Sequence, residues 1–179
     1  MAFTLVNAGG MSENTGKVRT VAVAAAHATI IAPGDIVRFT GTSRADGTAE
    51  VDVVTATGQQ VAGVVSGVNY NIAGENLTFT GLSASTAGEL FIHTSQDLLY
   101  TVPTTATLLA ADVGLNADAN FAVATRSGVL DISNVILNSA SKATTATLQF
   151  RIEGLLPDAA GVLGNVALVR INNQSATGV

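Results

Sequence analysis

The chain of 179 residues contains no cysteine, and this absence excludes disulfide bonds, thiolate metal sites and cysteine nucleophiles. Tryptophan is also absent, and aromatic residues make up only 4% of the chain. This scarcity argues against a sugar-binding module, because such modules usually present exposed Trp or Tyr platforms. No apolar run approaches the roughly 18 residues that a membrane-spanning helix needs, so we expect no membrane partner.

Charged residues are scarce as well. Lys, Arg, Asp and Glu make up 12% of the sequence, about half of the ~25% that is usual in soluble proteins. A free-standing soluble domain carries roughly 25–35% charged residues on its surface, which this chain can hardly supply. The deficit indicates that partners cover much of the surface. An extracellular β protein with an uncharged Ser/Thr surface is the alternative, and it remains open.

The few basic residues form no stripe. The 8 Lys and Arg residues are scattered from Lys17 to Arg170, against 13 Asp and Glu, which gives a net charge of −5 and a pI of about 4.7. Proteins that bind nucleic acid neutralise phosphates with clustered Lys and Arg. The sequence therefore predicts no nucleic-acid partner.

Residues 1–19 are rich in Gly, Asn, Ser and Thr and show no sustained hydrophobic period. We interpret them as an extended N-terminal arm, followed by a β domain over residues 20–179. The apolar run Val21–Ala26 resembles the core of a signal peptide, but it follows about twenty mostly polar residues and runs into His27 and Pro33. Its Val, Ala and Ile content indicates a strand, although Ala24–Ala26 fit a helix equally well.

Hydrophobic periodicity is clearest over Ala143–Gln174. Apolar and polar residues alternate in Thr144–Leu156, with the two-residue period of a strand that has one solvent-facing side. The side chains expected on the buried face are Leu148, Phe150 and Ile152. Those expected on the solvent face are Gln149, Arg151 and Glu153.

A second strand is predicted over Asn165–Asn172, where Ala167, Val169 and Ile171 are in phase and Arg170 is out of phase. The segment Pro157–Gly164 between the two strands contains a proline and two glycines. We therefore expect an ordered loop that joins the two strands. We take this strand pair to be the one around which the sheet forms.

Short strand-like runs recur along the rest of the chain. Asp46-Gly47 predicts a hairpin loop, and Gln60–Val68 is apolar on both phases but interrupted by glycines. Such a strand is buried on both faces, or bent where another backbone approaches closely. The remaining predicted strands are Val18–Ile31, Ile36–Thr40, Val51–Val54, Asn76–Thr80, Glu89–Thr94, Leu98–Val102, Ala119–Ala124 and Gly128–Leu137.

One segment, Thr104–Val113, has the pattern of a short helix, with Leu108 and Leu109 inside and Gly114 as a stop signal. Short strands with Gly and Asn punctuation otherwise dominate. The sequence therefore predicts an all-β, single-domain β-barrel or β-sandwich of short, mostly antiparallel strands around one core.

Candidate catalytic groups are few. His27 and His93 each lie in an apolar strand-like run without a second metal ligand at a workable spacing, so we expect core or interface histidines. Ser95 and Asp97 near His93 suggest a nucleophile triad, but neighbouring residues on one strand point to opposite faces.

Glu50 and Asp52 share a face if their segment is a strand, as paired carboxylates or calcium ligands do. A solvated strand face is the commoner arrangement. We predict that the chain is not an enzyme and holds no metal or other cofactor.

Several segments are similar, in the same order over residues 18–174, to the capsid decoration (structural cement) proteins of tailed bacteriophages. The segments are Gly34–Val37, Ala62–Gly67, Asp97–Tyr100, Asp112–Asp118, Ser127–Val129 followed by Leu137–Asn138, Thr145–Leu155 and Leu168–Asn172. In place of the Tyr-rich start of many relatives, this chain has Val21–Ala26.

The resemblance implies a virion structural protein on the outer surface of the icosahedral head. It would bind as a small homo-oligomer, a dimer or trimer, and bridge copies of the major capsid protein after the shell has expanded. The predominantly β pattern, the charge-poor composition and the lack of a catalytic constellation agree with this. Residues 1–19 are the candidate for an arm that orders on a neighbouring subunit.

We place the candidate capsid or subunit interface at five charged residues, Arg151, Glu153, Arg170, Lys17 and Arg19. Two other functions remain open at this point. One is another virion part, such as a head fibre base or a tail tube accessory. The other is a carbohydrate- or host-surface-binding β-module that uses Tyr70 or Tyr100.

Overall fold

The structure is a computed structural model, and it describes residues 3–5, 18–71 and 79–175. The fold is all-β, as the sequence predicts. The strands in chain order are β1 (Thr4–Leu5), β2 (Val18–Val23), β3 (Ile36–Ser43), β4 (Ala49–Val53), β5 (Gly63–Asn71), β6 (Gly88–His93), β7 (Tyr100–Pro103), β8 (Asn116–Ala117), β9 (Ala119–Asn120), β10 (Thr125–Ser127), β11 (Leu130–Ile132), β12 (Ile136–Leu137), β13 (Phe150–Pro157) and β14 (Leu163–Ile171).

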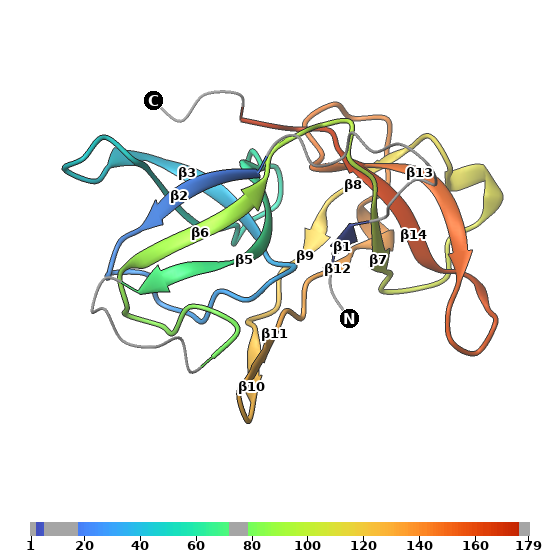
Figure 1. The fold of residues 1–179 in the computed structure, drawn as a ribbon. Coiled ribbons are helices and arrows are strands. Elements are labelled where there is room, and N and C mark those ends of the chain that lie inside the picture. The colour runs from blue at the N-terminus through green and yellow to red at the C-terminus, as the bar shows by residue number, and fades with distance from the viewer. Residues whose placement is uncertain (1–2, 6–17, 72–78, 176–179) are drawn as a thin grey trace.

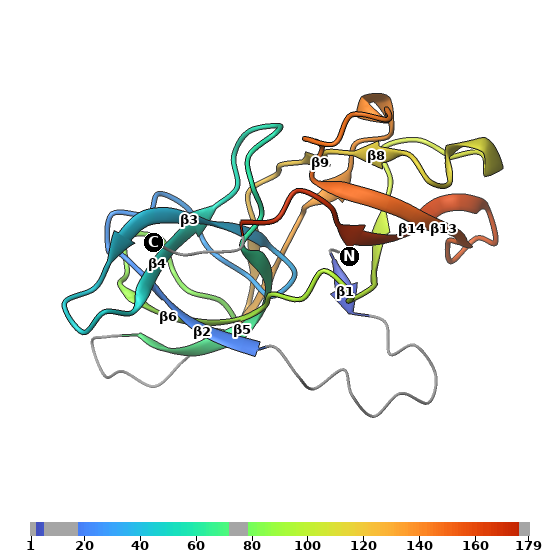
Figure 2. The same ribbon diagram turned by 90° about the horizontal axis from the view of Figure 1, so that it is seen from above.

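The first half of the chain forms a closed barrel in the strand order β2-β4-β3-β5-β6, in which β6 pairs with β2. These strands lie at the left of Figure 1 and form a ring when seen from above in Figure 2. Its ladders are antiparallel except for the short contact of β2 with β4. The predicted hairpin around Asp46-Gly47 is confirmed as the connection of β3 and β4.

The second half forms a five-stranded sheet in the order β1-β7-β14-β13-β8, at the right of Figure 1. Two smaller pairs, β10–β11 and β9–β12, lie in the chain between the sheet strands β8 and β13. The hairpin of β10 and β11 projects downward in Figure 1. Barrel and sheet are therefore consecutive along the chain, except that β1 joins the sheet.

The buried apolar residues form two clusters, where the sequence predicted one core. One cluster fills the barrel and the other covers the inner face of the sheet. Val37 and Val65 belong to the barrel cluster, whereas their neighbours Ile36 and Val64 belong to the sheet cluster. Successive residues of a strand point to opposite faces, so β3 and β5 form a wall shared by both clusters.

Two alternatives were predicted for Gln60–Val68, burial on both faces or a close approach of another backbone, and both are found. Val64 and Val65 are both buried, on opposite faces of β5. A Cβ atom added to Gly63 would lie 2.4 Å from the backbone oxygen of His93, a distance that real Cβ atoms do not reach. Only glycine lets β5 approach β6 this closely.

The predicted strand pair is confirmed as β13 and β14, with Phe150 opposite Ile171 and Ile152 opposite Val169. All four side chains are buried. The first strand begins at Phe150 rather than at Thr144, because the segment before it is held by turn and side-chain hydrogen bonds instead of a ladder.

The predicted helix over Thr104–Val113 is wrong. Only η1 (Ala110–Asp112) is helical there, and it is a 3-10 helix like η2 (Ser139–Ser141). The Thr104 hydroxyl donates to the Gly164 carbonyl and the Thr107 hydroxyl to Asn165. Hydroxyls that bond distant backbone and side-chain groups keep this segment extended instead of helical.

Other predicted strands are shorter than expected: the run from Val18 ends at Val23, and the run from Ala119 ends at Asn120. Most of the predicted strand Asn76–Thr80 and most of the predicted arm, residues 1–2 and 6–17, lie outside the described residues. In the described ranges no helix is long and apolar enough to cross a membrane.

Candidate interaction surface

Three of the five predicted interface residues lie together on the outer face of β13 and β14. Arg151 and Arg170 are cross-strand partners. The Nε atom of Arg170 lies 2.6 Å from Oε1 of Glu153, and the Nε atom of Arg151 lies 3.4 Å from the same oxygen. The structure therefore joins Arg151, Glu153 and Arg170 into one ionic cluster, which we call the hairpin charge cluster.

The hairpin charge cluster carries two positive charges and one negative charge, in a chain whose net charge is −5. The side chains of Arg151, Glu153 and Arg170 are 44%, 30% and 41% exposed. Exposed ion pairs contribute only about 0–1 kcal/mol to stability. Each guanidinium has five N–H donors, so the cluster remains able to bind an acidic partner.

Around this cluster the outer face of the sheet is a mixture of apolar and hydroxyl side chains. Leu168 lies opposite Thr101, and Thr101 lies opposite Thr4 of β1. All three side chains are exposed or half-buried. Gly154 lies beneath Leu168, because a Cβ atom added to it would be 3.7 Å from the Leu168 side chain. The face is thus broad enough to combine apolar contact with charge recognition.

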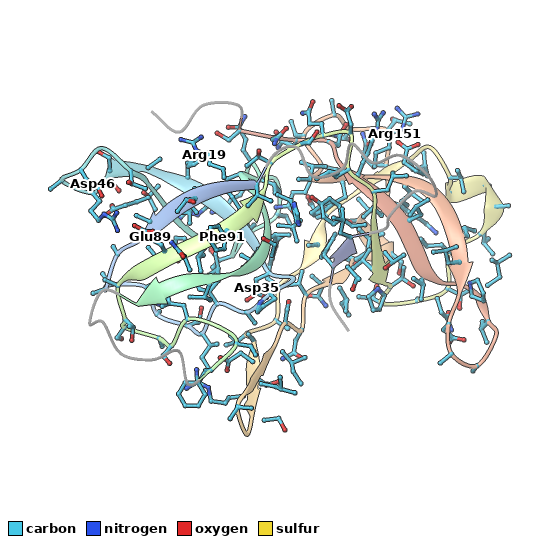
Figure 3. All side chains as sticks on the ribbon, in the orientation of Figure 1. Arg19, Asp35, Asp46, Glu89, Phe91 and Arg151 are labelled. Carbon is cyan, nitrogen blue, oxygen red and sulfur yellow. The ribbon has the colours of Figure 1, made fainter. Side chains whose placement is uncertain are left out.

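The other two predicted interface residues do not join this cluster. Arg19 lies on β2 of the barrel, where its guanidinium carbon is 5.0 Å from the centre of the Phe39 ring. Figure 3 shows Arg19 on the barrel and Arg151 on the sheet. Lys17 lies outside the described residues.

His27 is buried, as predicted, with 5% of its surface exposed. Its Nδ1 and Nε2 atoms lie 2.9 Å from the carbonyl oxygens of Ala24 and Ser83, respectively. It therefore links the turn after β2 to the segment before β6. His93, at the end of β6, is half-buried, and burial lowers the pKa of its ring.

The Ser95 hydroxyl accepts a hydrogen bond from the backbone N–H of Asp97, at 3.3 Å. This contact belongs to a turn between β6 and β7.

On the barrel, the Glu50 carboxylate accepts the Thr42 hydroxyl at 2.6 Å, and the Asp52 carboxylate lies 4.0 Å from Arg38. Within the described ranges, no three His, Asp or Glu side chains are grouped for metal binding.

Gln149 was predicted on the solvent face, and this prediction is wrong, because its side chain is completely buried. Its Oε1 atom accepts the Ala119 N–H at 3.0 Å, and its Nε2 atom donates to the carbonyls of Ala56 and Gln59. The amide thus connects the β4–β5 loop of the barrel to the sheet half. Alternation failed here because Gln149 precedes the first residue of β13.

The sequence analysis also missed a buried ion pair that holds the β10–β11 hairpin. Arg126 and Asp131 are cross-strand partners, and Nε of Arg126 lies 2.7 Å from Oδ1 of Asp131. The Asp131 side chain is completely buried and also accepts the Gly81 N–H. Arg126 stacks on the ring of Phe79, 3.5 Å from its centre. Opposite charges two residues before and two residues after the turn Gly128-Val129 were the signal in the sequence.

The structure has a second unexpected polar group, Asp35, which is 3% exposed. It lines a cavity of about 180 Å³ that lies between barrel residues such as Ile36 and Val54 and the segment around Phe121. Figure 3 shows Asp35 near the middle of the molecule, between barrel and sheet. Burial raises its pKa to about 6, against the lowering effect of the Ala32 N–H that it accepts.

Comparison with known proteins gives no further guide to function. No protein-family model matches the chain, and the searches of curated proteins and of solved structures likewise find no significant match.

Proposed function

We propose that this chain is a virion structural protein that binds the outer surface of a tailed-phage capsid. There it bridges copies of the major capsid protein and stabilises the expanded, DNA-filled head. The resemblance over residues 18–174 supports this function, and so do the all-β fold and the 12% content of charged residues.

The outer face of the β13–β14 hairpin is the observation that carries the proposal. It presents the hairpin charge cluster beside Leu168 and Thr101. The opposite face of the strand pair buries Phe150, Ile152, Val169 and Ile171. A half-exposed face with both charge and apolar area is the kind of surface that protein partners recognise. Its excess positive charge predicts that the partner surface is acidic.

The mechanism is cohesive. A specific protein contact buries about 1,200–2,000 Å² in total, and a bridging protein makes such contacts with more than one capsid subunit. After the first contact forms, the effective concentration at the second site is high. Modest contacts then combine into slow release, which holds neighbouring subunits together against the pressure of the packaged DNA.

Co-sedimentation with phage particles tests the proposal. The purified chain is mixed with expanded heads, with unexpanded heads and with tails of the phage that encodes it. We expect it to pellet with expanded heads. Pelleting with tails alone would contradict the proposal in favour of another virion part, and binding to a glycan array but to no particle would favour a host-surface module.

The charge cluster is tested by reversing one of its charges. Arg170→Glu should weaken binding to expanded heads by at least about tenfold, because it places a negative charge against the acidic partner. Arg38→Glu is the matched control, since Arg38 has similar exposure but lies on the barrel, 4.0 Å from Asp52. Equal affinities of the two variants would show that the outer face of the hairpin is not the binding surface.

A further inference from the structure

The first described residues of the chain form a short strand that is seated on the sheet rather than on the barrel. Strand β1 pairs with β7 through Thr4 opposite Thr101 and Leu5 opposite Tyr100. Phe3, just before it, is 4% exposed and belongs to the apolar cluster of the sheet. A three-residue segment therefore completes the edge of the sheet and supplies one of its buried aromatic side chains.

The seat of Phe3 is an aromatic slot in the sheet. The Phe3 ring lies 4.6 Å from the centre of the Phe150 ring and 6.2 Å from that of Tyr100, the latter in an edge-to-face arrangement. Aromatic pairs of this geometry contribute about 0.5–1.5 kcal/mol beyond the area that they bury. Phe3 is thus an anchor, and the two backbone pairs of β1 set its orientation.

Packing around β1 is incomplete on its barrel side. A cavity of about 320 Å³ lies there, lined by Phe3, Leu5, Val64, His93 and Tyr100 among others. The Tyr100 hydroxyl is buried without a hydrogen-bond partner in the described part of the chain, and burial raises its pKa. Among the described residues, the barrel side of β1 therefore borders this cavity.

The connection of β1 to the barrel permits another placement. Residues 6–17 link Leu5 to Val18, the first residue of β2. A segment of this length spans at most roughly 40 Å, which is close to the diameter of a compact chain of this size, about 30–40 Å. With a connection of this length, Phe3–Leu5 can therefore reach the slot of an adjoining copy.

We infer that β1 is exchanged between copies of this chain, so that Phe3–Leu5 of one copy fill the Tyr100–Phe150 slot of the next. The occupant is a second copy because the slot already fits this sequence, and exchange preserves each of its contacts. Exchange of an identical element is a low-cost route to a symmetric oligomer. The inference concerns the isolated chain and does not depend on capsid binding.

Engineered cysteines test the exchange without any capsid. The native chain has no cysteine, and facing residues of an antiparallel pair are about 4.5–5.5 Å apart at Cα, within the range of a disulfide. We would mix the single variants Thr4→Cys and Thr101→Cys, one of them carrying a mass tag, and oxidise the mixture. Exchange predicts a covalent heterodimer as the main product on a non-reducing gel.

The double variant Thr4→Cys/Thr101→Cys gives the complementary result. Exchange predicts covalent oligomers, whereas a strand that stays on its own sheet gives only an internally linked monomer. Internally linked monomer at every protein concentration, together with no heterodimer from the mixed single variants, would overturn the inference.

Sedimentation equilibrium of Phe3→Ala provides a second readout. Loss of the anchor should convert the oligomer to monomer, while Leu109→Ala, which changes a side chain that is 65% exposed, should leave the mass unchanged. A wild-type oligomer mass for Phe3→Ala would overturn the inference. Circular dichroism distinguishes this result from simple unfolding, because a dissociated but folded monomer keeps its β signal.

Discussion

Asp35 couples the stability of the protein to pH. Its Oδ2 atom accepts the Ala32 N–H at 2.8 Å, but burial dominates and raises its pKa from 3.8 to about 6. The folded protein therefore binds this proton more tightly than the unfolded chain. The stabilisation is fully present below pH 3.8 and is lost as the pH rises through about 6.

Replacing Asp35 by Asn should remove this dependence, because the amide has nearly the same shape and does not ionise. The difference in unfolding free energy between wild type and Asp35→Asn should change by about 2 kcal/mol from pH 4 to pH 7.5, in favour of the variant at the higher pH. Urea unfolding at several pH values measures it. Parallel stability curves for the two proteins would contradict the prediction.

Gln149 is a structural residue whose loss removes the partner of the buried Ala119 N–H and breaks the partly buried hydrogen bonds to the carbonyls of Ala56 and Gln59. An unsatisfied buried polar group costs about 1–3 kcal/mol. Gln149→Leu, which keeps the side-chain volume, should therefore lower the unfolding free energy by about 1–3 kcal/mol.

The matched control for Gln149 is Gln60→Leu, because Gln60 is exposed and surface substitutions usually change stability by less than about 0.5 kcal/mol. Denaturant midpoints of the two variants give the comparison. If Gln149→Leu were as stable as Gln60→Leu, the amide would not be what fastens the barrel loop to the sheet.

Among the elements, the β10–β11 hairpin is held by an ion pair between its two strands, Arg126 with Asp131. The fully buried carboxylate of Asp131 accepts two nitrogens of Arg126 and the Gly81 N–H. Removing one partner of a buried pair typically costs about 3–5 kcal/mol. Asp131→Ala should therefore open the hairpin locally, with loss of hydrogen-exchange protection at Ser127 and Leu130.

Leu130→Ala serves as the control for the hairpin, because the Leu130 side chain is 52% exposed and contributes little to folding. It should retain the wild-type exchange pattern. Protection that persists in Asp131→Ala would show that the stacking of Arg126 on Phe79 holds the hairpin without the carboxylate.

The elements also show how far sequence patterns extend. The β13–β14 pair was predictable because one of its faces is buried and the other faces solvent. The alternation of apolar and polar residues therefore shows that Ile152 and Val169 point to the core. Alternation gave the wrong face for Gln149 because its partners, Ala119 and Gln59, are distant in sequence. The helix predicted over Thr104–Val113 failed for the same kind of reason, since Thr104 and Thr107 bond Gly164 and Asn165.

At the scale of the whole molecule, the all-β class followed from the sequence but the division into barrel and sheet did not. Glycine and proline punctuation marks where strands end, but it does not say which strands pair. The only sequence signal for the wall of β3 and β5 that the two apolar clusters share was the apolar run Gln60–Val68, which is buried on both faces. Likewise, Arg151, Glu153 and Arg170 were candidates from their strand pattern, and the register of β13 and β14 brings them together.

The charge deficit also acts at this scale. With 12% charged residues, several of them paired within the chain as Arg126 is with Asp131 and Lys142 with Asp112, little charge remains to keep a free monomer apart from its neighbours. A protein of this composition suits a state in which partners cover much of its surface. The capsid proposal and the exchange of β1 both supply such a state, through different contacts.

The temperature at which phage particles release their DNA is the most direct measure of the proposed function. Particles that carry this protein and particles that lack it would be heated in parallel, with DNA release followed by a fluorescent dye. We predict release at a higher temperature when the protein is present, and restoration of that temperature when purified protein is added back. Equal release temperatures with and without the protein would contradict its role in stabilising the head.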